Sequence, residues 1–320
     1  MKNNKYNLYG EIAQFIEKLN SVNTKPIYDL TFDEAKNFLR TIQEKDYKNI
    51  PAEICDTEII TPLDGNVSLR FVRPNNTKDI KLPLIIYAHG GGWVMGDETT
   101  HDELIKKLAI NTNCAVAFVK YPHSPKAAFP VAFNQIYAAL DFLYNNPDDY
   151  NIDSNKIILA GDSAGANMIS AAAIRAKEEK GPDILLQILL YPALSYEMDT
   201  KSYKKFKDGP WLTKKAMEWF WNAYIQDKEQ IKNYYAQPLI APNDVLNGLP
   251  KTLIITAEND VLRNEGENFA DKLNNANVDV ACVRIIGAIH DFMMLNAISD
   301  TKPAKTAFNI VYSAIKDVLN

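Results

Sequence analysis

The stretch Lys156–Ala172 (KIILAGDSAGANMISAA) constrains the fold of this chain more than any other. A short apolar run, Ile157–Ala160, breaks at the pentapeptide GDSAG and is followed at once by small residues in a helical pattern. A strand that turns sharply into a helix around Gly-x-Ser-x-Gly is the setting in which the serine acts as a nucleophile. The stretch therefore predicts an exposed, nucleophilic Ser163. The next amide, that of Ala164, should lie at a helix N-terminus, where free N–H groups favour an oxyanion.

Apolar runs alternate with helical patterns along most of the chain, which predicts an α/β fold. The expected strands are Glu58–Thr61, Val67–Val72, Leu84–Ala88, Ala115–Val119, Ile157–Ala160, Leu185–Tyr191, Leu253–Ala257 and Val280–Ile286. The expected helices are Thr99–Ile110, Val131–Tyr144, Ala164–Lys180, Glu265–Asn274 and Ala304–Leu319. Such alternation indicates a mostly parallel central sheet, of about eight strands here, with helices on both faces.

Two segments fall outside this alternation and predict a helical cap. Residues 1–50 precede the strands and show two helical patterns, the second opened by a capping box at Thr31–Glu34. Residues 195–249 form an aromatic-rich insertion between two strands, and long insertions in compact domains are usually lids or binding loops. We therefore expect an N-terminal cap segment (1–50), a core (51–194 and 250–320) and a cap or lid insertion (195–249).

A glycine loop follows the predicted strand Leu84–Ala88, in the sequence His89-Gly-Gly-Gly-Trp93. Glycines let backbone N–H groups approach a reacting carbonyl without obstruction by Cβ, and this motif supplies oxyanion-hole amides in lipases and esterases. A phosphate-binding loop is the rival interpretation. It is disfavoured because Asp97 and Glu98 follow in place of Lys-Ser, and two carboxylates repel phosphate.

A serine needs a base beside it, and the chain has only four histidines. His290 follows a late strand, and strand ends in such sheets face the active site, so it is the best candidate for the base. Asp260, in the loop after Leu253–Ala257, is the candidate carboxylate that orients it; Glu258 competes for this role, and Asp291 is a weaker candidate. The order Ser, Asp, His along the chain is the one expected for this fold.

Composition and charge exclude several classes of function. With 35 basic and 40 acidic residues the net charge is −5, which leaves no electrostatic footprint for nucleic acid. The N-terminal stretch lacks the pattern of a signal peptide, and no apolar run is long enough to span a membrane. Cys55, Cys114 and Cys282 are scattered through apolar, strand-like contexts, which predicts reduced core thiols in a cytoplasmic protein and no metal site.

The paired motifs HGGGW and GDSAG resemble those of the hormone-sensitive-lipase-like family of α/β hydrolases. Residues 259–266 resemble its Asp-Pro-Leu-x-Asp-Glu-Gly loop, which implies that Asp260 is the acid of the triad. The resemblance, which covers residues 50–320, also implies that Gly91, Gly92 and Ala164 donate the oxyanion-hole amides. The chain departs from the family pattern at six positions that concern fine specificity: Pro122, Lys126, Ala166, Val261, Asn264 and Asp291.

These observations together predict a serine carboxylesterase that hydrolyses short-chain acyl esters without a cofactor or metal. Trp93 and Trp211 are the predicted pocket residues, because bulky aromatic rings after the glycine loop and in the insertion would limit acyl length. An amide hydrolase on the same fold and a non-catalytic ligand-binding module are the alternatives, since a fold does not dictate function. The expected partner is a small-molecule ester, and a homodimer is left open as the assembly.

Overall fold

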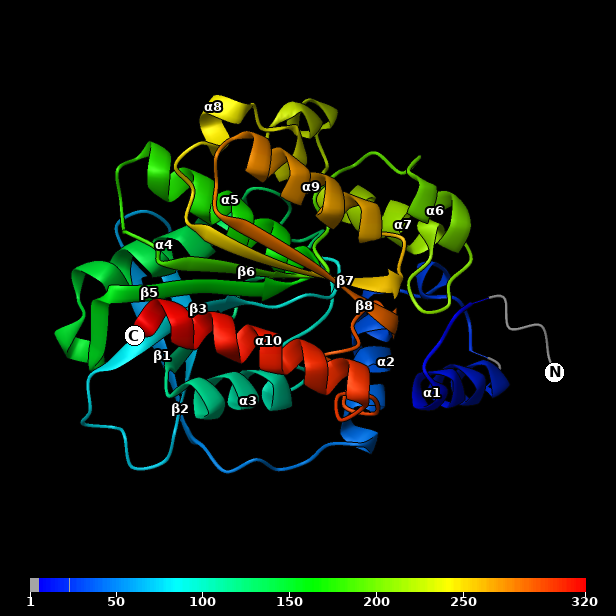
Figure 1. Cartoon of the computed structure of the whole chain (residues 1–320), viewed down its shortest axis with the longest axis horizontal. Coiled ribbons are helices and arrows are strands. Elements are labelled where there is room, and N and C mark those ends of the chain that lie inside the picture. The colour runs from blue at the N-terminus through cyan, green and yellow to red at the C-terminus, as the bar shows by residue number, and fades with distance from the viewer. Residues whose placement is uncertain (1–5, 23) are drawn as a thin grey trace.

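The computed structural model describes residues 6–22 and 24–320, and its centre is one eight-stranded sheet (Figure 1). The strand order is β1-β2-β4-β3-β5-β6-β7-β8, in which β2 runs antiparallel to β1 and β4 while the other neighbours are parallel. This confirms the mostly parallel sheet that the sequence predicts. The strands are β1 Glu53–Thr61, β2 Gly65–Arg73, β3 Leu82–Ala88, β4 Ala115–Val119, β5 Ile152–Asp162, β6 Leu186–Leu190, β7 Lys251–Asn259 and β8 Val280–Ile289.

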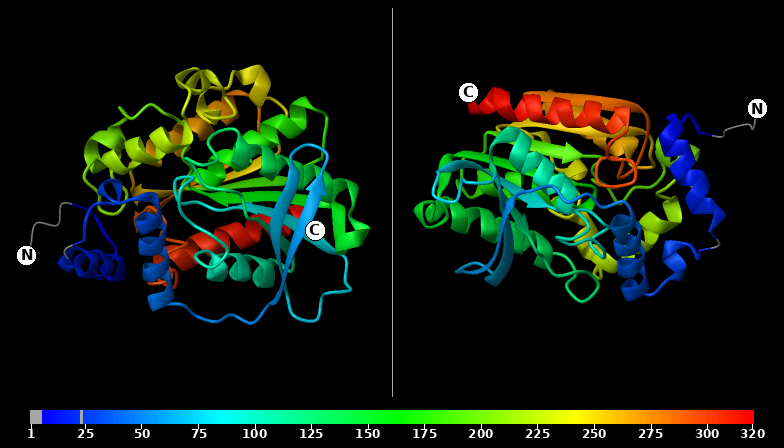
Figure 2. Two further views of the ribbon diagram at one scale, coloured as in Figure 1. Left: turned by 180° about the vertical axis from the view of Figure 1, so that it is seen from behind. Right: turned by 90° about the horizontal axis from the view of Figure 1, so that it is seen from below.

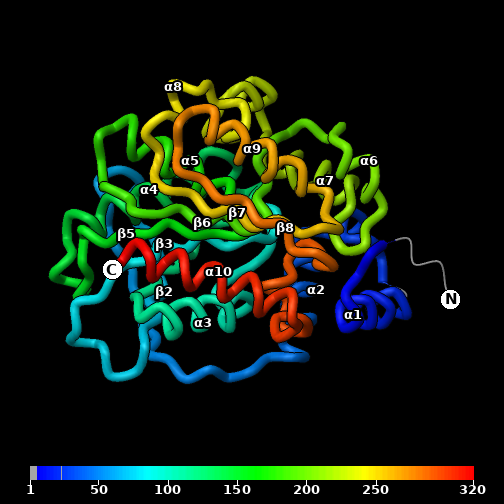
Figure 3. The backbone as a smooth tube through the Cα atoms, viewed as in Figure 1, coloured from blue at the N-terminus to red at the C-terminus, as the bar shows by residue number. Residues whose placement is uncertain are grey.

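Helices cover both faces of the sheet (Figures 1 and 3). On one face lie α3 (Asp102–Thr112) and α10 (Lys302–Leu319), and on the other lie α4 (Val131–Asn145), α5 (Ala164–Glu178) and α9 (Arg263–Asn275). The central strands are buried on both faces, which is why β4 (AVAFV) reads as an unbroken apolar run and why even the one polar residue of β6, Gln187, is buried.

The two outermost strands explain one wrong prediction from the sequence. Cys55 lies on β1 and Cys282 on β8, at the two edges of the sheet, and both side chains are exposed. Only Cys114, just before the central strand β4, is a buried thiol as expected. An edge strand keeps a face that the helices do not cover, so apolar neighbours in the sequence do not guarantee burial there.

Four further helices gather at the carboxyl end of the parallel strands (Figure 2). They are α1 (Gly10–Ser21) and α2 (Phe32–Lys45) from the N-terminal segment, and α6 (Lys201–Phe206) and α7 (Lys214–Tyr224) from the insertion. The predicted capping box is confirmed: the Thr31 hydroxyl accepts from the Glu34 amide at 3.2 Å, and the Glu34 carboxylate accepts from the Thr31 amide at 2.8 Å. A short helix, α8 (Asn243–Leu246), ends the insertion.

Hydrogen bonds tie both segments to the core loops. The Tyr9 amide donates to the carbonyl of Gly287 on β8 at 3.0 Å, and the Gln43 side chain donates to the carbonyl of Met294 at 2.9 Å. At the start of the insertion, the buried Glu265 carboxylate accepts from the amides of Leu194 and Ser195 at 2.6 and 2.9 Å. Across the described residues, 6–22 and 24–320, no helix combines the length and apolarity needed to cross a membrane.

Candidate active site

Ser163 stands on a sharp turn between β5 and α5. Its backbone has φ 51° and ψ −117°, a strained conformation for a residue with a Cβ. The residue is only 5% exposed, so the serine is buried at the base of a cavity and not exposed as the sequence predicts. The flanking glycines make room for the turn: a Cβ on Gly165 would lie 2.0 Å from the carbonyl oxygen of Ala88, and one on Gly161 would lie 2.8 Å from the same atom. The sequence can form this sharp turn because it has glycine two residues before and two residues after the serine, where a side chain would not fit.

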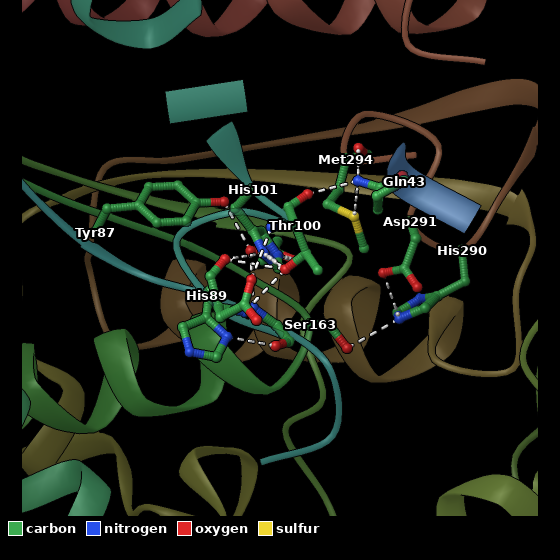
Figure 4. Close-up of polar contacts among 12 residues, drawn as sticks. Gln43, Tyr87, His89, Thr100, His101, Ser163, His290, Asp291 and Met294 are labelled. Atoms are coloured by element: carbon green, nitrogen blue, oxygen red, sulfur yellow. Dashed lines mark hydrogen bonds and ion pairs between the residues drawn. The ribbon is translucent and has the colours of Figure 1, made fainter. Parts of the chain in front are cut away.

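Three strand ends bring Ser163, Asp260 and His290 together. Ser163 follows β5, Asp260 follows β7 and His290 follows β8. The Nε2 atom of His290 lies 2.9 Å from the Ser163 hydroxyl, and its Nδ1 atom lies 2.7 Å from Oδ2 of Asp260 (Figure 4 shows the serine and the histidine). The second oxygen of Asp260 accepts from the Leu262 amide at 3.0 Å, which holds the carboxylate in place. The chain therefore contains a hydrogen-bonded line of hydroxyl, imidazole and carboxylate.

Neither of the two competing carboxylates contacts Nδ1 of His290. Glu258 accepts from the backbone amide of Gly287 at 2.8 Å and from the Asn7 side chain at 3.0 Å, away from His290. Asp291 does approach the imidazole, but at Nε2, with its Oδ1 atom 3.3 Å away (Figure 4). Only Asp260, among the three candidates, faces Nδ1.

The glycine loop lies beside the nucleophile. Gly91 and Gly92 have φ of 102° and 62°, a backbone region that side chains disfavour. A Cβ on Gly91 would lie 2.4 Å from the Met95 carbonyl oxygen, and one on Gly92 would lie 2.2 Å from the Phe220 ring. Together with Ala164, the first residue of α5, both glycines line the same cavity as Ser163.

A buried carboxylate that the sequence analysis passed over connects this loop to the turn. Asp162, fully buried, accepts from the Gly90 amide at 3.0 Å and from the Tyr87 hydroxyl at 2.7 Å, and its other oxygen lies 3.3 Å from Nε2 of His101 (Figure 4 shows Tyr87 and His101). Burial alone would raise the pKa of Asp162, but His101 and Tyr87 outweigh it and hold the pKa below 3.8. The signal was present in the sequence, since a charged residue at the end of an apolar strand needs a partner.

The remaining histidines have structural surroundings. His89 is buried and stacks on Tyr121 with ring centroids 4.1 Å apart, and burial lowers its pKa well below 6.5. His101 pairs with Asp162 beneath the glycine loop. Within residues 6–22 and 24–320, no three or more His, Cys, Asp or Glu side chains are arranged to hold a metal ion.

A cavity of about 380 Å³ opens above Ser163. Its walls come from the glycine loop, from the N-terminal segment (among others Leu19, Tyr28 and Phe38) and from the insertion (among others Trp211 and Phe220). Both predicted pocket residues therefore line it. Trp93 is fully buried, with its ring stacked on Tyr224 at 4.2 Å, and the Trp211 indole donates to Oδ2 of Asp291 at 2.8 Å.

Comparison with known proteins agrees with this geometry. A family described as alpha/beta hydrolase fold matches residues 85–294. The chain belongs to the hormone-sensitive-lipase-like family of α/β hydrolases. An esterase of Gibberella moniliformis is 32% identical over 79% of this chain and 80% of its own length, and the carboxylic ester hydrolase LipN of Mycobacterium tuberculosis is 32% identical over 83% and 71%. The crystal structure of a thermostable esterase from Pseudomonas putida superposes with a TM-score of 0.95, at 36% identity and 98% coverage of both chains.

These relatives show that this α/β hydrolase is a carboxylic-ester hydrolase acting on small molecules. One of its departures from the family pattern stands inside the site. Asp291, where the family usually has glycine, has φ 63°, the left-handed conformation that glycine adopts freely and that Asp tolerates better than most residues. The departure therefore keeps the backbone of the family and adds a carboxylate to the cavity.

We expect the activity of this hydrolase to rise with pH through neutrality. Burial alone would lower the pKa of His290, but Asp260 and Asp291, with a smaller contribution from Asp162, raise it to about 9. With His290 as the expected base, activity should be lost as the pH falls through this value, because only a neutral imidazole can take a proton from the serine. The measurement is the pH profile of kcat/KM for a neutral ester, whose acid limb should lie well above 6.5.

A variant identifies the cause of this shift. Asp291→Asn removes one of the two carboxylates nearest to His290, so the acid limb should move toward lower pH. Tyr191, whose ring packs edge-on against the imidazole 5.1 Å away, carries no charge in this range, because burial raises its pKa well above 10. An acid limb at or below pH 6.5 in the wild-type enzyme would contradict the expectation.

Proposed function

We propose that this carboxylesterase hydrolyses short-chain acyl esters through an acyl-enzyme on Ser163. The hydroxyl attacks the acyl carbon while His290 takes its proton at Nε2, and Asp260 orients the imidazole and stabilises its charged form. The amides of Gly91, Gly92 and Ala164 bind the oxyanion, and each such donor is worth about 10²–10³ in rate. His290 then protonates the departing alcohol, and water releases the acid by the same steps. The observation that carries the proposal is the pair of contacts that His290 makes, with the Ser163 hydroxyl at 2.9 Å and with the Asp260 carboxylate at 2.7 Å.

The cap is part of this proposal. Residues 1–50 and 195–249 both contribute side chains to the cavity wall over Ser163, which supports their assignment as a cap on the core (51–194 and 250–320). The three unpaired cysteines fit a cytoplasmic location, where thiols stay reduced. The homodimer stays a prediction.

The preference for short acyl groups rests on rigid aromatic walls. Trp93 packs against both Tyr224 and Trp221, with centroids 4.2 and 4.6 Å apart, and the Phe220 ring covers Gly92. Each buried methylene contributes about 0.8 kcal/mol, and this gain ends where the acyl chain meets a wall that cannot move. We therefore expect kcat/KM for p-nitrophenyl esters to peak between about two and six acyl carbons.

The same assay separates the alternatives. An esterase releases p-nitrophenol with a burst and leaves the matched p-nitroanilides nearly untouched, an amide hydrolase cleaves both, and a binding module cleaves neither. Phe220→Leu should move the optimum to longer chains, and Trp93→Ala should do so only if the variant still folds, since removing a fully buried indole costs about 3–5 kcal/mol. A rise that continues past ten carbons, or activation at an emulsion interface, would refute the preference for short chains.

A further inference from the structure

The cavity wall contains one carboxylate for which the ester-hydrolysis mechanism has no role. Asp291 follows His290 directly, and its side chain is 13% exposed. Of the described residues that line the cavity it is the only Asp or Glu. One carboxylate oxygen accepts from the Trp211 indole at 2.8 Å, and the other faces Nε2 of His290 at 3.3 Å. A buried carboxylate with so few hydrogen-bond donors around it is stabilised by a ligand that brings a further donor.

The position of Asp291 assigns it to the alcohol side of the substrate. In the reaction proposed above, Nε2 of His290 delivers its proton to the oxygen of the departing alcohol. That oxygen must therefore lie close to Nε2, and Oδ1 of Asp291 is 3.3 Å from the same atom. Groups on the first carbons of the alcohol come within reach of this carboxylate, while the acyl group extends from the other side of the reacting carbon.

Within residues 6–22 and 24–320, no lysine or arginine forms an ion pair with Asp291, whose one ion-pair partner is His290. Lys25 is the only other residue with a permanent charge among the described residues of the cavity wall, and it is exposed in the N-terminal segment. His290, 3.3 Å away, has to be neutral to take the serine proton, so in the reactive form of the enzyme it is no cation for Asp291 either. Burial raises the pKa of Asp291 above 3.8. His290 and the indole of Trp211 act in the opposite direction, but they do not make up for the water that the carboxylate has lost.

The rest of the wall suits an organic cation. Trp211, Phe220 and Tyr28 line the same cavity, and aromatic faces attract ammonium groups when water is excluded. We propose that Asp291 is a specificity residue that binds a protonated amine carried by the alcohol part of the ester. This inference rests on the proposed esterase mechanism. The bound cation also takes the place of His290 as the partner of the Asp291 carboxylate, so that the proton on Nε2 is donated to the departing alcohol.

Two esters of the same shape test the proposal. At pH 7, 2-(dimethylamino)ethyl acetate carries a protonated amine where 3-methylbutyl acetate carries a CH group. Wild-type enzyme should hydrolyse the cationic ester with a kcat/KM about 10- to 100-fold higher, the range expected for a hydrogen bond between charged groups. In Asp291→Asn the ratio should fall to within about threefold of unity, since the amide lacks the charge but keeps the acceptor for Trp211.

Matched variants keep the outcome decisive. Asn and Gly both tolerate the φ of 63° at this position, so Asp291→Gly repeats the test if Asp291→Asn folds poorly. Glu258→Gln removes a charge of the same sign from the same end of the sheet without touching the cavity, and should leave the wild-type ratio unchanged. Equal rates for the two esters in the wild type, or an unchanged ratio in Asp291→Asn, would overturn the role of Asp291 alone. Failure to hydrolyse either ester would overturn the proposed esterase mechanism with it.

Discussion

Replacing Ser163 with alanine is expected to lower kcat for p-nitrophenyl acetate by about 10⁶, which is the cost of removing the nucleophile from a serine triad. Without the hydroxyl, the imidazole 2.9 Å away has no proton to take and no acyl-enzyme forms. The backbone amides that we propose bind the oxyanion remain, as does the cavity, so a residual rate above that in water should persist. The measurement is steady-state turnover together with labelling by a fluorophosphonate, which should disappear.

The fold should survive this substitution. Ser163 makes no side-chain cap to α5, and alanine carries the same Cβ through the strained φ of 51°. Ser170, seven residues along the same helix and fully buried, offers a matched control: Ser170→Ala removes a hydroxyl that has no hydrogen-bond partner and should leave turnover nearly unchanged. Turnover within tenfold of wild type in Ser163→Ala, or a label on another serine, would contradict the assignment of the nucleophile.

The parts of this site that the sequence predicts are those with local causes. GDSAG and HGGGW each contain glycines at positions where a Cβ would clash with neighbouring atoms, so their turns can be recognised from a few residues. The order of strands and helices likewise follows from hydrophobic patterns and the alternation expected of a parallel sheet. His290 and Asp260 could be nominated because each follows a predicted strand, and such ends meet at one edge.

What the sequence could not predict depends on contacts between distant segments. Asp162 meets His101 and Gly90 only after three loops have packed together. The approach of Asp291 to Nε2 instead of Nδ1 depends on the backbone angle at the end of β8, which no pattern in the sequence encodes. The exposure of Cys55 and Cys282 follows from the places of β1 and β8 at the sheet edges, and chain order does not reveal those places.

The second large effect is expected at Asp260, where replacing one carboxylate oxygen by an amide nitrogen should be enough to abolish most of the activity. Asp260→Asn is expected to lower kcat by about 10⁴, because an amide that donates toward Nδ1 stabilises the tautomer with its proton on Nε2, where the serine proton must be received. The shape is retained, and the amide oxygen can still accept from the Leu262 amide, so the free energy of unfolding should change far less than the rate.

Glu258→Gln separates this effect from a loss of charge alone. Glu258 lies two residues before Asp260 and carries the same charge, but it accepts from the Gly287 amide and does not contact His290. Its neutral variant should therefore retain most of the wild-type kcat, and thermal unfolding of both variants should show whether either fold is disturbed. If Glu258→Gln proved the more damaging of the two, the acid of the triad would be Glu258, and the 2.7 Å contact between Asp260 and His290 would not be the one that orients the base.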